Sequence, residues 1–364
     1  MNFKKSRAEF SVTVFSILVL IGACSPSFAA KHPKLATPAF VPTEMFGEFK
    51  RLSDQPILKP RKDRFDSAGA FNPSVVKNKD GKFVMLYRGQ DNSGVSRIGY
   101  AISDDGVKFE ADEHPILAPK LADEEKGIED PRLSPSLVEV GKWDLTATAY
   151  NTDAQLVLYR SSDLRNWDRV STMMPAKKGA WNINWTKSGA IVPEKISGKY
   201  WAYYMGDDKN GRDQTGVISS TDGANWTDAT DQPVLKHRPG KFDSRVVEPG
   251  PAPIMTKDGI LLLYNGADDG LTYKTGWALF DRKDPTKLLA RCDKPIFVPE
   301  MKWEKKIASK VVHQAPNVVF VEGLVKDGTR YLVYYGAADS YVGVAETRLE
   351  VVSNDRMKKK SHLK

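Results

Sequence analysis

The sequence predicts an all-β protein with the fold of a five-bladed β-propeller. Two phrases recur at nearly even spacing along its 364 residues. In one phrase, apolar residues follow a proline: Pro56, Pro115, Pro233 and Pro295, with Met173-Met174-Pro175 in the missing place. In the other, a glycine turn precedes a strand rich in aromatic residues. Its glycines are Gly81, Gly141, Gly198, Gly259 and Gly328.

Five units of short strands with little helical periodicity favour radial repetition around one axis. A third phrase in three units places an aromatic residue at fixed distance after a Ser/Asp turn, where we expect it to plug the outer edge: Phe109, Trp167 and Trp226. Two β-sandwich domains are the alternative architecture. No change of composition and no Pro/Ser-rich linker divides residues 50–350 to support it.

The N-terminus is typical of an export signal. A basic stretch precedes an apolar run over residues 10–21, which is short for a membrane span. Cys24 ends a segment that resembles a bacterial lipobox, while Ser27-Phe28-Ala29 offers an alternative cleavage site. We expect a signal peptide over 1–24, an extended leader over 25–45, the propeller over 46–350 and a basic tail over 351–364. The mature protein is then periplasmic or at the cell surface, touching the membrane only through a lipid on Cys24.

Charge and composition exclude several classes of function. The net charge is +8, and much of it lies in the signal and in the last seven residues. No basic stripe with interleaved aromatic residues is present, so a nucleic-acid partner is not expected. Five histidines lack the spacing of metal ligands, and we expect neither a metal nor a cofactor. Cys292 is expected to be a small buried side chain.

Ionisable residues recur at one fixed position before the glycine turns, which we call the station. Counting back 11 residues from Gly141, Gly198 and Gly259 reaches Asp130, Lys187 and Glu248. This station belongs to the innermost strand of each blade, whose start opens into a central funnel. The other two repeats place polar residues nearby: Asn72, His313, Gln314 and Asn317.

Carboxylates that face one another across a pocket are the basic equipment for glycoside cleavage. We expect Asp130 to handle the proton, with Arg132 tuning it. Glu248 is the leading base, with Glu194 and Asp207 as further candidates. Polar groups near the ends of the second strands suit sugar hydroxyls: Arg88, Asn151, Asp207, Asn265 and Asp339, with Arg97 added. Three tryptophans can stack on sugar faces: Trp185, Trp201 and Trp277.

Several motifs together resemble glycoside hydrolase family 130, the β-mannoside phosphorylases and β-mannosidases. They are FNPSVV, GIEDPRL, VPEKISGKY, EPGPAPIMTKDGILLLYNGAD and YYGAADSYVGVA, within residues 50–347. The resemblance implies a five-bladed propeller and an oligosaccharide substrate. It implies that Asp130 is a general acid acting through a mannose hydroxyl, and that mannose is held by Asn72, Arg88, Arg97 and Asp339.

Members of this family that use phosphate carry basic residues for it. Lys187 matches one of them, but Tyr204-Met205 stands where a His-Arg pair is typical. This departure resembles the members that hydrolyse β-1,2-mannosides. We therefore expect an inverting β-mannosidase. The alternatives are a mannoside phosphorylase, a lipid-anchored glycan-binding propeller without turnover, and an arabinan or xylan hydrolase, which would not explain the motif set.

Overall fold

The computed structural model describes residues 40–176, 181–309 and 314–352. The chain separates into two units, 1–39 and 40–364, and only the second contains described residues. The signal, Cys24, His313 and most of the tail lie outside the described ranges. Within these ranges the chain is all-β, with two short 3₁₀ helices and no α-helix. Neither 3₁₀ helix is long and apolar enough to cross a membrane.

The strands form five antiparallel groups, and all except the last are built from consecutive segments of the chain. Group 1 contains β3 (Gly69–Lys77), β4 (Phe83–Gln90), β5 (Ser96–Ser103) and β6 (Glu110–Ala111). Group 2 contains β7 (Gly127–Pro135), β8 (Trp143–Tyr150), β9 (Ala154–Ser161) and β10 (Asp168–Met174). Group 3 contains β11 (Thr186–Ile191), β12 (Tyr200–Asp207), β13 (Asp213–Ser220) and β14 (Thr227–Asp228).

The other two groups follow the same plan. Group 4 contains β15 (Val246–Pro249), β16 (Ile254–Met255), β17 (Ile260–Ala267), β18 (Tyr273–Phe280) and β19 (Leu288–Arg291). Group 5 contains β20 (Val319–Asp327), β21 (Arg330–Ala337), β22 (Tyr341–Thr347) and the early strand β2 (Lys50–Arg51). The 3₁₀ helices are η1 (Ala122–Glu124) and η2 (Lys302–Glu304).

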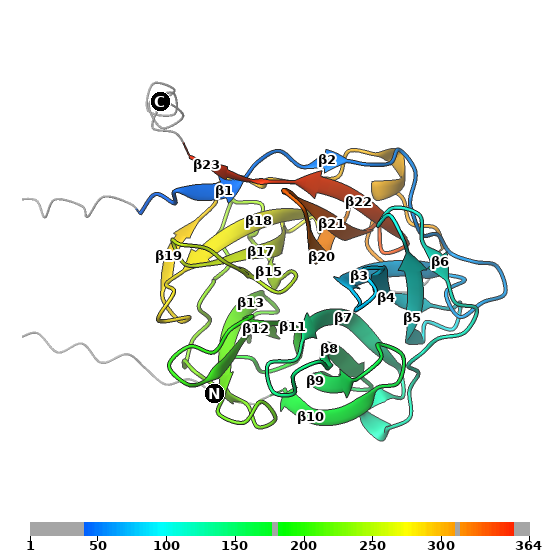
Figure 1. The fold of residues 1–364 in the computed structure, drawn as a ribbon, viewed down its shortest axis with the longest axis horizontal. Helices are drawn as coiled ribbons and strands as arrows, with labels where there is room; N and C mark the ends of the chain where they lie inside the picture. The colour runs from blue at the N-terminus through cyan, green and yellow to red at the C-terminus, as the bar shows by residue number, and fades with distance from the viewer. Residues whose placement is uncertain (1–39, 177–180, 310–313, 353–364) are drawn as a thin grey trace, which may run out of the picture. The chain divides into compact units, whose positions relative to one another are not determined.

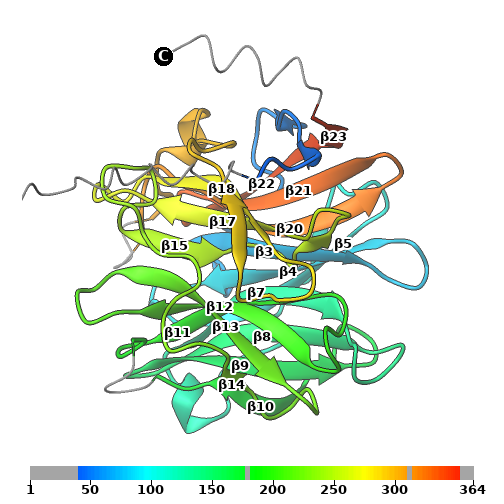
Figure 2. The same cartoon turned by 90° about the vertical axis from the view of Figure 1, so that its left-hand side faces the viewer.

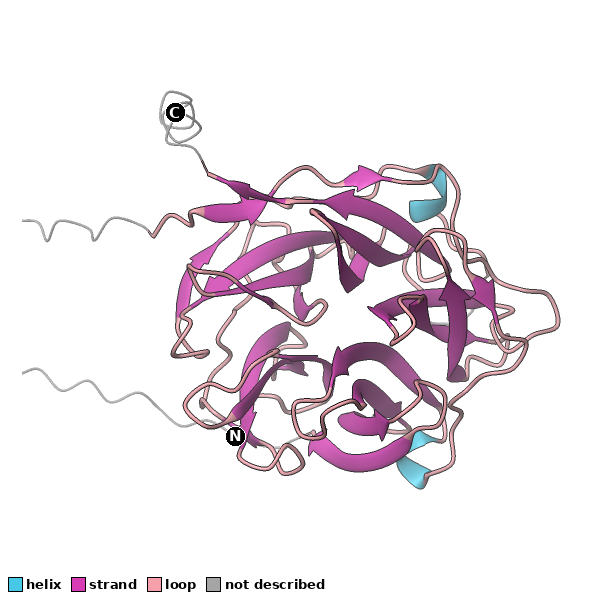
Figure 3. Cartoon of the chain, in the orientation of Figure 1, coloured by secondary structure: helices cyan, strands magenta, loops and turns pink. Residues whose placement is uncertain are grey.

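Figure 1 shows the five groups arranged around a common centre, with β3, β7, β11, β15 and β20 nearest to it. Figure 3 shows that strands dominate every group. The innermost strands are those that precede the recurring glycine turns, as the sequence predicts. Neighbouring groups are joined by few backbone pairs: one parallel pair links β5 to β7, and another links β13 to β15.

The beginning and the end of the described chain close group 5 together. Strand β2 pairs with β22, and β1 (Glu44–Phe46) pairs with β23 (Leu349–Val351). Figures 1 and 2 both show the blue early strands beside the red late ones. Residues 44 and 45, expected to be leader, are therefore part of a strand pair. The side chain of Asp258 adds a further link by accepting hydrogen bonds from Thr43.

Each group contains a buried tyrosine whose hydroxyl meets a carboxylate. The pairs are Tyr87–Asp66, Tyr159–Glu124, Tyr204–Asp228, Tyr264–Asp243 and Tyr335–Glu304. In four of them an arginine completes the contact: Arg61, Arg169, Arg238 and Arg51. Because a buried charge needs a partner, these acids serve the fold, and their recurrence explains many of the tyrosines in the repeats.

Apolar clusters fill the space within and between the groups. The three aromatic residues of the third phrase, Phe109, Trp167 and Trp226, are partly buried against separate clusters. Cys292 is buried in another cluster, as expected, where its sulfur lies 3.7 Å from the Tyr264 hydroxyl.

Candidate functional site

Three innermost strands share one kind of bulge at the central axis, while a fourth, β20, has a register shift of its own between Val321 and Gly323. The pairing register shifts between Phe71 and Ser74 in β3, between Glu129 and Arg132 in β7, and between Lys187 and Ala190 in β11. A residue in the left-handed region lies in each bulge: Asn72 at φ 49°, Asp130 at φ 53° and Ser188 at φ 58°. Residues other than glycine rarely adopt this backbone conformation, and strained backbone of this kind is frequent at functional sites.

The strand register corrects the alignment of the repeats. Glu129, Lys187 and Glu248 occupy equivalent places, opposite Thr148, Met205 and Asn265 of the next strands. Counting back 11 residues from the glycines reached Asp130 in place of Glu129, because the number of residues between this position and the glycine differs between groups. Asp130 is instead equivalent to Asn72 and Ser188. Glu129 was missed for the same reason.

A pocket of about 260 Å³ opens at the centre, and we call it the axial pocket. Six residues selected from the sequence line it: Asn72, Arg88, Asp130, Lys187, Glu248 and Asp339. Every one of the five groups contributes at least one of them, although none lies on β20. The fold thus brings together residues that are far apart in sequence. Further lining residues include Gln90, Trp185, Met205, Asp213, Tyr273 and Gln314.

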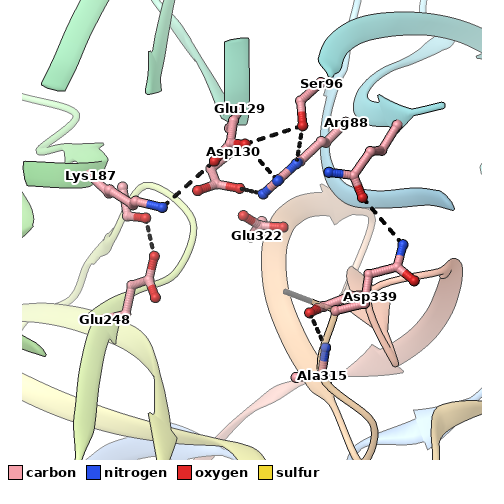
Figure 4. A network of polar contacts seen from close by, with 12 residues as sticks. Arg88, Ser96, Glu129, Asp130, Lys187, Glu248, Ala315, Glu322 and Asp339 are labelled. Carbon is pink, nitrogen blue, oxygen red and sulfur yellow. Dashed lines mark hydrogen bonds and ion pairs between the residues drawn. The ribbon is translucent and has the colours of Figure 1, made fainter. Parts of the chain in front are cut away.

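Two cationic side chains among the described residues line the axial pocket, and both are engaged by carboxylates (Figure 4). Arg88 donates to Asp130 at 3.1 Å and to Glu129 at 2.6 Å. The Lys187 ammonium lies 3.6 Å from the other oxygen of Glu129. Burial acts to lower the pKa of Lys187, but the charges of Glu129 and Asp130 outweigh it and raise the pKa, so the ammonium stays charged.

The pKa values of Asp130 and Glu248 shift in opposite directions. Burial acts to raise the pKa of Asp130, but Arg88, Lys187 and Arg132 outweigh it and hold that pKa below its ordinary value. Burial raises the pKa of Glu248 to about 7, although Arg132 opposes the shift. Glu248 also receives a hydrogen bond from the Ser188 hydroxyl. The empty site thus holds one ionised carboxylate and one that retains its proton up to neutrality.

Arg132 and Glu322 lie buried beneath these two acids. Arg132 pairs with Glu322 at 2.8 Å and lies 4.0 Å from Glu248. It also donates to the carbonyl oxygens of Asp130, Pro249 and Gly250, which ties groups 2 and 4. Glu322 is fully buried, and burial raises its pKa well above the ordinary value. Sequence reasoning proposed the tuning role of Arg132 but missed Glu322.

Two more acids line the axial pocket. Burial raises the pKa of Asp339 to about 6, while the backbone N–H of Ala315 donates to its carboxylate at 2.7 Å. Asp213, which sequence reasoning did not select, has a pKa raised to about 6 by burial. Its carboxylate accepts the indole N–H of Trp185 at 2.9 Å. Asp213 begins β13, a strand start that carries no recurring motif to reveal it.

Three predicted site residues do not line the axial pocket. Glu194 pairs with Arg282 at the surface, so the geometry removes it as a candidate base. Asp207 is buried beside the pocket and accepts a hydrogen bond from Asn184. Arg97 pairs with Asp91 in the β4–β5 hairpin at 2.6 Å.

Other proposed sugar contacts also fall elsewhere. Trp201 and Trp277 pack against apolar clusters, and only Trp185 of the three tryptophans lines the axial pocket. Asn265 bonds the backbone of Val321, and Asn151 donates to the carbonyl of Ala122. Among the described residues, no group of three or more side chains is suited to hold a metal ion.

Opposed carboxylates with separated pKa values, set in a polar pocket at the centre of an all-β fold, define a candidate active site for cleavage of glycosidic bonds. A family model described as beta-1,4-mannooligosaccharide phosphorylase matches residues 38–356. The chain belongs to glycoside hydrolase family 130.

Relatives with assigned activities are similar over most of their length. A 1,2-beta-oligomannan phosphorylase of Thermoanaerobacter sp. (strain X514) is 35% identical, with 82% of this chain and 96% of the relative covered. A beta-1,2-mannobiose phosphorylase of the same strain is 32% identical, over 83% and 98%. One solved structure is 32% identical in sequence to this chain. It comes from work on family members that are glycoside hydrolases targeting beta-1,2 mannosidic linkages in Candida mannan. Its TM-score is 0.72, and 85% of this chain and 96% of that chain are covered.

Proposed function

We propose that this protein is an inverting β-mannosidase that hydrolyses β-1,2-linked manno-oligosaccharides in the axial pocket of a five-bladed β-propeller. Asp130 acts as the general acid and Glu248 as the base that activates water. The family and its β-1,2-mannoside-active relatives support the substrate class. The five strand groups around one centre support the propeller.

The charge of the axial pocket is the observation that carries hydrolysis rather than phosphorolysis. Among the described residues, four carboxylates line it against two cations: Asp130, Asp213, Glu248 and Asp339 against Arg88 and Lys187. Both cations already contact Glu129 or Asp130. A phosphate dianion needs uncommitted positive charge, whereas a carboxylate can polarise a neutral water molecule.

Met205 supports the same choice. It lines the axial pocket opposite Lys187, at the position where the phosphate-using pattern carries a basic pair. Its neighbour Tyr204 is buried within group 3, where its hydroxyl donates to Asp228. Neither residue can compensate the charge of a phosphate.

In the proposed reaction, water attacks the anomeric carbon from the face opposite the leaving oxygen. Glu248 takes a proton from this water, and the proton of Asp130 reaches the leaving oxygen through a mannose hydroxyl. Arg88, Asn72 and Asp339 hold the terminal mannose. The pKa order of the empty pocket favours the proton on Glu248, and the proposed roles therefore require that sugar binding moves this proton to Asp130.

The products of β-1,2-mannobiose with and without inorganic phosphate test this function. We expect free mannose at the same rate in both, because water is the attacking group. Carbohydrate chromatography reads the outcome. Mannose 1-phosphate that forms only with phosphate would refute hydrolysis.

Phosphorolysis is the second candidate, and Lys187 favours it. Its ammonium lines the axial pocket, and its carboxylate contact with Glu129 is long at 3.6 Å. The curated relatives are also phosphorylases. In this case Lys187→Ala would abolish any dependence of the rate on phosphate while leaving thermal unfolding unchanged. A non-catalytic glycan-binding role would require sugar binding without turnover of any β-mannoside.

The pH dependence of kcat/KM follows from the shared proton. Below the lowered pKa of Asp130 both acids are protonated, and above about 7 both are ionised. We expect kcat/KM to be highest on the acidic side of pH 7 and to fall about tenfold per pH unit above it. Initial rates between pH 4 and 9, with intrinsic fluorescence to confirm folding, measure this. A rate that keeps rising through pH 7–9 would contradict the pairing.

We also propose export with lipidation at Cys24, which rests on the N-terminal sequence alone. Fractionation of the native host should place the parent protein in the membrane fraction and Cys24→Ser in the soluble exported fraction. Recovery of the parent protein in the cytoplasm would refute export.

A further inference from the structure

A second cavity, which we call the side cavity, lies beside the axial pocket. Its volume is about 790 Å³, against about 260 Å³ for the axial pocket. Arg88, Gln90, Trp185 and Lys187 line both cavities, so the two adjoin each other. The axial pocket is the smaller of these two neighbouring cavities.

The base of the axial pocket is closed. Arg132 is 3% exposed and Glu322 is fully buried, and they form an ion pair beneath Asp130 and Glu248. A saccharide whose end unit lies between those two acids cannot continue through the axis. The rest of the chain must leave through an opening at the side, and the side cavity provides one.

Residues that line only the side cavity come from groups 1 and 2, apart from Ser309 in the segment before β20. Asn92 and Ser93 lie in the hairpin loop between β4 and β5, Lys126 precedes β7, and Tyr150 ends β8. The backbone N–H of Lys126 donates to the carbonyl of Tyr150 at 2.9 Å, and its ammonium lies 6.0 Å from the ring centroid. Glu129 is the one carboxylate among the described residues of this lining, and it is already bound by Arg88.

The chemistry of this lining suits a neutral polyhydroxylated chain. An aromatic ring can stack on the apolar face of a sugar ring, while amide, hydroxyl and ammonium groups can form hydrogen bonds with its hydroxyls. Trp185 stands where the two cavities meet, is 38% exposed, and is oriented by the hydrogen bond to Asp213. An exposed indole held in this way offers a fixed surface to the first sugar beyond the cleaved bond.

We propose that the side cavity binds the sugar units that follow the cleaved bond, with Trp185 under the first unit and Tyr150 under a later one. The protein therefore prefers β-1,2-manno-oligosaccharides longer than the disaccharide. This inference rests on the proposed function, which supplies the sugar in the axial pocket. It assigns to Tyr150, Asn92 and Lys126 a role in selecting chain length, without contact with the reacting atoms.

Calorimetric binding of β-1,2-mannobiose and β-1,2-mannotetraose tests this, with all proteins carrying Asp130→Asn to suppress turnover. We expect the tetraose to bind more tightly than the biose. Tyr150→Ala should weaken tetraose binding about three- to tenfold and leave biose binding unchanged. Tyr150→Phe should keep the affinity, because the ring remains. Tyr331→Ala removes a partly exposed tyrosine that lines neither cavity and is the matched control.

Asn92→Ala provides a second variant in an exposed loop, with the same selective loss of tetraose binding expected. Equal affinity of the parent for both sugars, an equal loss for both in Tyr150→Ala, or binding of neither would overturn the proposal. Turnover by the protein with Asp130 intact is measured separately. Tetraose binding with no release of mannose from any β-mannoside would refute the proposed function and leave the side cavity as a binding site.

Discussion

Asp130→Asn is expected to lower kcat for β-1,2-mannobiose by about 10²–10⁴-fold, because the leaving sugar then departs without a proton. The substitution keeps the shape of the side chain and its capacity to accept from Arg88. The left-handed backbone at φ 53° also suits asparagine. The loss should therefore be chemical, with the unfolding temperature close to that of the parent.

A good leaving group separates the acid from the base. For a nitrophenyl β-mannoside, proton transfer to the leaving oxygen matters little, so Asp130→Asn should retain most of the parent rate. Glu248→Gln should lose activity on both substrates, because water activation is still required. Initial rates on the two substrates give this comparison.

Glu194→Gln is the matched control, because it changes a carboxylate outside the axial pocket that pairs with Arg282. It should keep the parent rate on both substrates. The reverse result, with Glu248→Gln rescued by the nitrophenyl substrate and Asp130→Asn inactive on it, would exchange the two roles. The pKa order of the empty pocket makes this exchange the main competing assignment.

Arg132→Met is expected to lower the free energy of unfolding by about 3–5 kcal/mol, since it takes the cation away from buried Glu322 and leaves three buried carbonyl groups without their donor. Arg132 is 3% exposed, pairs with Glu322 at 2.8 Å and donates to three backbone carbonyl groups. Chemical denaturation followed by tryptophan fluorescence measures the effect.

Two further variants isolate the ion pair. Arg330→Met breaks exposed pairs with Asp327 and Glu346 and should cost at most about 1 kcal/mol. In Arg132→Met/Glu322→Met, removal of the second charge should restore part of the lost stability. A loss in Arg132→Met no larger than in Arg330→Met would mean that the buried pair does not hold the centre of the fold together.

The sequence predicted the innermost strands well, because glycine turns and alternating apolar residues depend on local backbone chemistry. Lys187 and Glu248 were also found, since repetition brings equivalent positions to one centre, and Asp130 was found because it directly follows the equivalent residue Glu129. Glu129 and Glu322 were missed because the turns that follow β7 and β20 differ in length, as the end pairs Pro135–Trp143 and Asp327–Arg330 show, and this breaks the fixed count from the glycines. Asp213 was missed because burial beside Trp185 is visible only in three dimensions.

The residues that misled have local explanations. Glu194 belongs to a segment that resembles a family motif, yet the turn that follows β11 carries it to the surface. Arg97 alternates to the face of β5 that meets Asp91 and is held there. A side chain near a site in sequence thus needs the strand register to decide which way it points.

The anomer released first from β-1,2-mannotetraose, followed by proton NMR with and without phosphate, tests the central claim most directly. Opposed acids that direct water across the axial pocket predict α-mannose first, at a rate independent of phosphate. β-Mannose as the first product, or mannose 1-phosphate in place of mannose, would contradict the account.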